Sequence, residues 1–116
     1  MAIGNVITIA SSEEIGRVLK KGRRKNGSLL SLYYLSRHTE DLCEAPEGRV
    51  AFIAGKKLGG AVWRNRSKRV LRAALRQAGG TRAGYDLLLV AHARTAASAS
   101  PDVAQELTML LKEAHI

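Results

Sequence analysis

The segment 61–78 constrains the fold more than any other stretch, because its side chains divide into two faces only when they are wound as a helix. At about 100° per residue, one side gathers the apolar residues and one serine: Trp63, Ser67, Val70, Leu71, Ala74, Leu75 and Ala78. The other side gathers cations and one amide: Asn65, Arg66, Lys68, Arg69, Arg72 and Arg76, with Arg64 at the border. The pattern predicts a helix that packs one face on a sheet.

Positive charge is concentrated around this segment. The chain has 19 Lys and Arg against 10 Asp and Glu, a formal net charge of +9. Residues 48–85 contain ten of the cations and no acid, which leaves nine cations against ten acids elsewhere. Because unbalanced cations repel one another, this predicts a polyanionic partner. Nucleic acid is the first candidate and an anionic membrane surface the second.

Arginine outnumbers lysine five to one in 61–78, and this favours the first candidate. A guanidinium group offers a planar fork to phosphate oxygens, whereas an ammonium group is a point charge. A second, smaller basic run lies earlier in the chain, at 20–25. It has an alternative interpretation as the charged last turn of a helix, where cations favour the helix dipole.

The chain reads as one domain, 1–116, of a cytoplasmic protein. Its 116 residues are enough for one core, and no run of 18 apolar residues predicts a membrane span. Residues 1–10 lack a cation, which argues against a secretory signal. A single cysteine, Cys43, excludes an internal disulfide and fits a reducing compartment.

Apolar runs and capping signals place the other elements. Ser11 and Glu14 form a capping box for a helix that Gly22 ends. Strands are predicted at 29–36, 49–54 and 85–91. A last helix begins at 100–102, with Pro101 as its first helical residue. This order predicts an α+β layer around one sheet.

Alternation within 29–36 assigns its side chains to two faces. One face takes Leu30, Leu32 and Tyr34, and the other takes Leu29, Ser31, Tyr33 and Leu35. Residues 37–48 form a polar, acidic connection, and 55–60 form a glycine-punctuated loop. The last helix has an apolar stripe made of Val103, Leu107, Leu110, Leu111 and Ala114.

The sequence shows no set of residues typical of an active site. Cys43 lies in a polar stretch with no ligand-spaced partner, and His38, His92 and His115 are scattered. Neither a catalytic triad nor a metal-ligand spacing emerges. We therefore expect no catalytic residue and no metal ligand in this chain.

One stretch resembles a known family. Residues 61–72 (AVWRNRSKRVLR), preceded by GKKLG at 55–59, are similar to the RNR signature of the bacterial ribonuclease P protein subunit. The resemblance extends over roughly 11–114. It implies a two-layer α-β sandwich in the order αβββαβα, with a left-handed βαβ crossover against the general rule.

The resemblance also implies a function. The family's protein assists an RNA enzyme that removes the 5′ leader from precursor tRNA, and the RNA does the chemistry with bound Mg²⁺. The expected partners are therefore this catalytic RNA and precursor tRNA. The RNA-binding residues it implies are Lys56, Lys57, Arg64, Asn65, Arg66, Lys68, Arg69 and Arg72.

A cleft for the leader is implied as well, between the first helix and the sheet. Its residues here are Ile15, Leu19, Ser31 and Tyr33. Ile15 and Leu19 stand where the family usually has phenylalanines, so the wall stays apolar but loses aromatic stacking. Gly60 replaces the usual asparagine, and residues 1–10 lack the family's basic segment.

Two other functions remain as alternatives. One is a stand-alone RNA-binding or ribosome-associated protein on a similar sandwich. The other is a DNA-binding protein, although a helix-turn-helix needs a partner helix directly before the basic helix. Here a strand and the loop 55–60 precede it.

Overall fold

A computed structural model describes residues 8–9, 11–36, 48–55, 57, 59–82 and 84–116. His38, Cys43, Lys56 and the expected connection up to residue 47 lie outside them. The elements are α1 (Ser12–Lys21), β1 (Arg23–Asn26), β2 (Leu30–Ser36), β3 (Arg49–Ile53), α3 (Ala61–Gln77), β4 (Tyr85–Ala91) and α4 (Ser100–Glu113). The order αβββαβα and the α+β class are confirmed.

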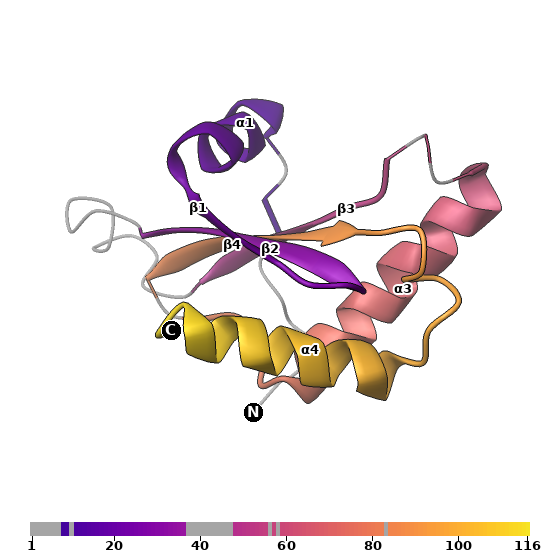
Figure 1. Ribbon diagram of the computed structural model, residues 1–116. Coiled ribbons are helices and arrows are strands. Elements are labelled where there is room, and N and C mark those ends of the chain that lie inside the picture. The colour runs from indigo at the N-terminus through magenta and orange to yellow at the C-terminus, as the bar shows by residue number, and fades with distance from the viewer. Residues whose placement is uncertain (1–7, 10, 37–47, 56, 58, 83) are drawn as a thin grey trace.

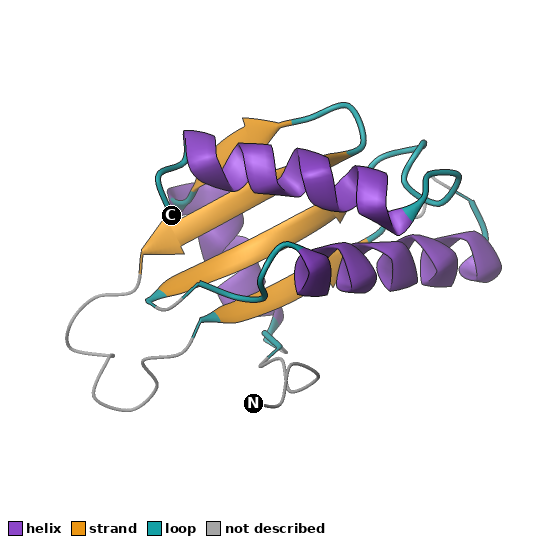
Figure 2. Cartoon of the chain, turned by 90° about the horizontal axis from the view of Figure 1, so that it is seen from below, coloured by secondary structure: helices purple, strands orange, loops and turns teal. Residues whose placement is uncertain are grey.

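The four strands form one mixed sheet in the order β1-β2-β4-β3. β2 runs antiparallel to β1 and β4, whereas β3 and β4 are parallel and are joined through α3. α1 lies over one face of the sheet, and α3 and α4 lie on the other (Figure 1). The view onto that second face shows α3 and α4 side by side (Figure 2).

The larger core fills the space between the sheet and the pair α3 and α4. The predicted inward residues of β2, Leu30, Leu32 and Tyr34, all belong to it. Leu29 packs here too, so its assignment to the opposite face was wrong. It precedes the first residue of β2, where strand alternation does not apply. The stripes of the two helices complete this core with Leu71, Ala74, Leu75, Val103, Leu107, Leu110 and Leu111.

A smaller core lies under α1. Val18 is fully buried there against Ala51 and Leu88. Ile9 joins this cluster, and its backbone N–H donates to the carbonyl of Val50 at 2.9 Å. Both faces of the sheet are therefore packed, and α1 depends on one central valine.

The ends of α1 follow the capping signals in part. The Ser11 hydroxyl accepts from the backbone N–H of Glu14 at 3.4 Å, which confirms the N-cap. Gly22 ends the helix, and its N–H donates to the carbonyl of Val18 at 2.8 Å. A Cβ on Gly22 would lie 2.5 Å from that oxygen and 2.8 Å from the carbonyl oxygen of Tyr34. The helix can turn into β1 here because the residue has no side chain.

Two local expectations need correction. The basic run after α1 contains a strand, β1, which sequence periodicity did not show because its four residues are all polar. β1 is an edge strand defined by its pairing with β2, and cations are typical of such edges. α4 is capped by Ala99, so Ser100 is already helical and Pro101 is its second residue.

Candidate nucleic-acid interface

Close contacts of Gly59 and Ser67 with Trp63 hold the apolar side of α3 in place near its start. A Cβ on Gly59, whose φ is +140°, would lie 3.0 Å from the Trp63 ring, so the backbone packs directly against the indole. Ser67 is fully buried and donates its hydroxyl hydrogen to the carbonyl of Trp63 at 3.1 Å. Both residues turn inward, as the helical pattern predicts.

The outer side of α3 is a bare cationic surface, here called the α3 face. Its exposed residues are Asn65, Arg66, Arg69, Arg72 and Arg76, and Arg64 and Lys68 are half-buried beside them. Lys57, in the preceding loop, is exposed as well. No described carboxylate forms an ion pair with any of these cations. The repulsion within the α3 face is therefore left for an external anion to relieve.

Arg72 is held in place by an aromatic ring. Its guanidinium carbon lies 5.4 Å from the centroid of the Phe52 ring on β3. This distance is within the range of a cation–π contact, which contributes about 0.5–1 kcal/mol at an exposed site. The contact orients Arg72 while its N–H groups remain available.

Val62 also belongs to the α3 face, although it carries no charge. It is 83% exposed, the highest value among the large hydrophobic residues of the described chain. Together with Asn65, Arg66 and Arg69 it lines a shallow depression of about 450 Å³. The i, i+3, i+4, i+7 spacing of these four residues could have revealed the stripe.

The predicted cleft residues lie on the other side of the sheet, Ile15 and Leu19 on α1 and Ser31 and Tyr33 on β2. Ile15 and Tyr33 both pack, half-buried, against the smaller core. Leu19 is 44% exposed at the end of the helix. Ser31 lies on the same side of β2 as Tyr33, but it is only 5% exposed. The structure therefore brings Ile15 and Tyr33 to one cluster and leaves Leu19 at its margin.

The hydroxyl of Ser31 is already engaged. It lies 2.7 Å from Asn26 Oδ1 and 2.7 Å from His92 Nε2. His92 was one of three histidines that looked scattered in the sequence, and the pairing of β2 with β4 brings it to this place. Polar groups thus gather on the α1 side of the sheet, two residues along β2 from Tyr33.

A charged network ties α1 to the sheet. Arg49 donates from Nε and Nη2 to the Asp86 carboxylate at 3.0 and 2.8 Å, and its Nη1 lies 2.6 Å from Glu14 Oε1. The hydrogen bond to Asp86 raises the pKa of Arg49, burial acts against it, and Glu14 adds to the rise. Arg49 was counted among the unbalanced cations of 48–85, but its charge is neutralised within the protein.

Two further observations concern metals and membranes. Within the described parts of the chain, no group of three or more His, Cys, Asp and Glu side chains could hold a metal ion. None of the described helices is both long enough and apolar enough to cross a bilayer.

The fold and the α3 face together define a class: a small basic α-β protein with a cationic surface of the kind that nucleic-acid-binding proteins carry. The comparisons with known proteins give the family. The family model described as Ribonuclease P matches residues 5–115. The chain therefore belongs to the ribonuclease P protein family.

Relatives and solved structures agree with this assignment. The ribonuclease P protein component of Syntrophomonas wolfei is 35% identical over 109 residues, which cover 93% of this chain and 87% of that protein. That of Dehalococcoides mccartyi strain CBDB1 is 35% identical over 108 residues, covering 93% and 84%. The RNase P protein of Staphylococcus aureus superposes with a TM-score of 0.75 at 23% identity, covering 95% of this chain and 96% of that one. The Thermotoga maritima protein gives 0.73 at 18%, covering 91% and 96%. At these identities the structures show the shared fold.

Proposed function

We propose that this chain is the RNA-binding subunit of a ribonucleoprotein that removes the 5′ leader from precursor tRNA in the cytoplasm. The α3 face binds the catalytic RNA, and the α1 side of the sheet, around Tyr33 and Ile15, holds the leader. The observation that carries the proposal is the α3 face, whose cations lack an acidic partner among the described residues. The RNR residues of the family fall on this surface.

In this proposal the RNA supplies the chemistry. Mg²⁺ is bound mainly by the RNA and assists hydrolysis of the phosphodiester bond. The protein's contribution is electrostatic, because each arginine that meets a phosphate displaces condensed counterions and lets two RNA segments approach. The matching positions are Lys56, Lys57, Arg64, Asn65, Arg66, Lys68, Arg69 and Arg72.

Leader contact depends on Tyr33 in this chain. Where the family usually has phenylalanines it has Ile15 and Leu19, which offer an apolar wall without an aromatic platform. Ser31 has its hydroxyl bound to Asn26 and His92, so its part is to shape the surface beside Tyr33. A base stacked on Tyr33 would contribute roughly 1–3 kcal/mol.

The experiment is reconstitution. The purified chain, added to a bacterial ribonuclease P RNA at a low Mg²⁺ concentration at which the RNA alone is slow, should restore cleavage at the mature 5′ end of tRNA. The chain without RNA should cut nothing. Cleavage by the chain alone, surviving further purification, would contradict the proposal. Failure to restore cleavage while binding RNA tightly would favour a stand-alone RNA-binding protein.

A further inference from the structure

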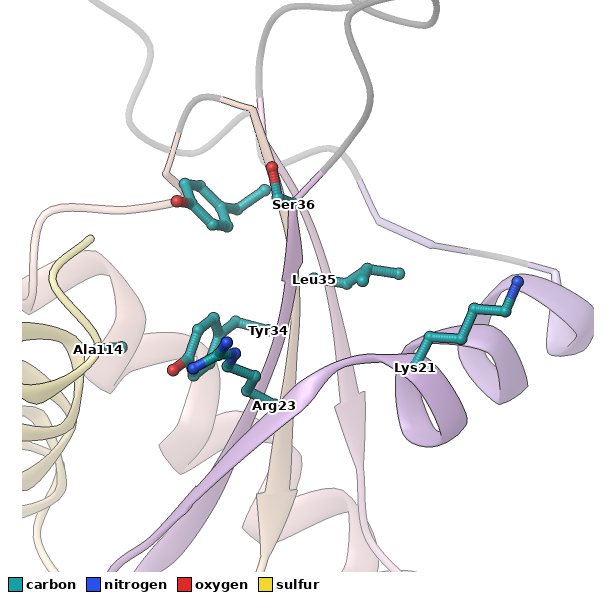
Figure 3. Close-up of a pocket in the computed structure, with 7 residues that line it drawn as sticks. Lys21, Arg23, Tyr34, Leu35, Ser36 and Ala114 are labelled. Atoms are coloured by element: carbon teal, nitrogen blue, oxygen red, sulfur yellow. The ribbon is translucent and has the colours of Figure 1, made fainter.

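A pocket of about 340 Å³ lies at the end of the sheet where β2 ends and β4 begins. It is lined by Lys21, Arg23, Tyr34, Leu35, Ser36, Tyr85 and Ala114. Figure 3 shows Arg23 and Tyr34 side by side, reaching toward Ala114, the C-cap of α4, whereas Lys21 and Leu35 turn to the other side of β2. The proposed function makes no use of this pocket, which lies at the end of the sheet and takes Tyr34 and Tyr85 from the side that carries α3 and α4.

The surroundings of the pocket are a second acid-free region. Residues 15–39 contain seven Lys and Arg and no Asp or Glu. Five of the cations cluster around the turn from α1 into β1: Lys20, Lys21, Arg23, Arg24 and Lys25. None of these five forms an ion pair with a carboxylate in the part of the chain that the structure describes. Like the α3 face, this region leaves its positive charge for an external anion.

The pocket adds aromatic and polar groups to that charge. Arg23 and Tyr34 are partners in the pairing of β1 with β2, and Ser36 and Tyr85 are partners in the pairing of β2 with β4. Two phenol rings, a guanidinium and a hydroxyl thus meet in a space that falls within the usual range of small-ligand sites. Aromatic rings stack on any base, and a neighbouring arginine binds the phosphate.

We propose that this pocket binds one unpaired ribonucleotide of the catalytic RNA, its base against Tyr85 and its phosphate on Arg23. The inference rests on the proposed function, since it names a second contact with the same RNA. Position favours the catalytic RNA over the leader. The two phenol rings of the pocket, Tyr34 and Tyr85, lie on the face of the sheet that carries α3 and α4, whereas Tyr33 lies on the other. The molecule is 40 Å in its longest dimension, so a few nucleotides of an RNA docked on α3 can span the distance.

Binding of the catalytic RNA alone, without precursor tRNA, gives the first test. Arg23→Gln should weaken binding about tenfold and lower the slope of log affinity against log salt by about 0.7. Arg94→Gln is the matched control, because Arg94 is also exposed but follows the opposite end of β4. It should stay within about twofold of the wild type. Equal effects of the two substitutions would overturn the proposal.

The aromatic wall is tested at Tyr85, which is half-buried. Tyr85→Leu should weaken binding about tenfold and leave the salt slope unchanged, whereas Tyr85→Phe keeps the ring and should keep the affinity. Thermal unfolding of both variants separates loss of the ring from loss of the fold. If a folded Tyr85→Leu protein binds as tightly as Tyr85→Phe, the pocket does not stack a base.

A crosslink identifies the RNA. In a Cys43→Ser background, Ser36→Cys carrying a photoreactive azide should crosslink to an unpaired nucleotide of the catalytic RNA in the assembled holoenzyme. Crosslinks confined to the leader of precursor tRNA, or to neither RNA, would overturn the proposal. A different result would overturn the proposed function itself, namely that the wild-type chain does not bind the catalytic RNA. The pocket alone fails if Arg66→Gln weakens binding and Arg23→Gln does not.

Discussion

Glu106 joins α4 to the turn between β1 and β2. Its carboxylate accepts hydrogen bonds from the backbone N–H groups of Ser28, Leu29 and Leu30 at 3.1, 2.7 and 3.1 Å, and from the Ser28 hydroxyl at 2.9 Å. A Cβ on Gly27 would lie 2.3 Å from Glu106 Oε1, so a side chain at this position would displace the carboxylate from its hydrogen bonds. Burial alone would raise the pKa of Glu106, but the hydrogen bonds from Leu29 and Ser28 outweigh it and the pKa is lowered.

Glu106→Gln should therefore destabilise the protein in a pH-dependent way. The glutamine amide can accept at one oxygen only, and we expect a loss of about 1–3 kcal/mol at pH 7. Because the folded pKa lies below the ordinary value of about 4.3, the carboxylate stabilises the fold above that value. The stabilisation is lost as the pH falls through the folded pKa. Urea unfolding of both proteins at pH 7 and pH 3 should show the difference shrinking. A difference that stays constant would contradict this account.

At the scale of the element, one glycine lies within α1 and another ends it. Replacing them by alanine should change the stability of the protein in opposite directions. A Cβ on Gly16 meets nothing within 4 Å, so Gly16→Ala should stabilise the helix by about 1 kcal/mol. Gly22→Ala should destabilise the protein by about 1–3 kcal/mol, because its Cβ would press on the carbonyl oxygens of Val18 and Tyr34. Gly22 has a φ of −75°, so the cost is crowding rather than backbone strain. Thermal unfolding checks both; a stabilised Gly22→Ala protein would show that the turn can relax.

The sequence predicted the elements that carry a recognisable pattern within their own residues. α3 and β4 lie within one residue of their expected bounds, because a helical stripe and a continuous apolar run are local signals. β1 carries no such signal, since its polar residues form a strand only by pairing with β2. The same holds for contacts. The pairing of Arg49 with Glu14 and Asp86 joins three elements, and no spacing along the chain indicates it.

For the whole molecule, the sheet separates two surfaces of different chemistry. The face that carries α3 presents unpaired arginines, whereas the face under α1 presents a phenol ring set among aliphatic side chains. A phosphate backbone is bound by the first kind of surface, and unpaired bases by the second. Under the proposed function, this separation would let one small chain hold two RNAs at the same time, because the two binding surfaces do not overlap.

This separation predicts that substitutions on the two surfaces have different effects. Arg66→Ala, and likewise Arg64→Ala, should weaken binding to the catalytic RNA and reduce the salt slope by about 0.7–0.9, since one phosphate contact is lost. Tyr33→Ala should leave that binding intact and reduce the preference of the holoenzyme for precursor over mature tRNA about tenfold, while Tyr33→Phe keeps the ring and the preference. Filter binding of each RNA across a salt series measures both quantities. If Arg66→Ala and Tyr33→Ala changed the RNA affinity and the precursor preference in the same way, the two RNAs would not bind to separate surfaces, and this account would be wrong.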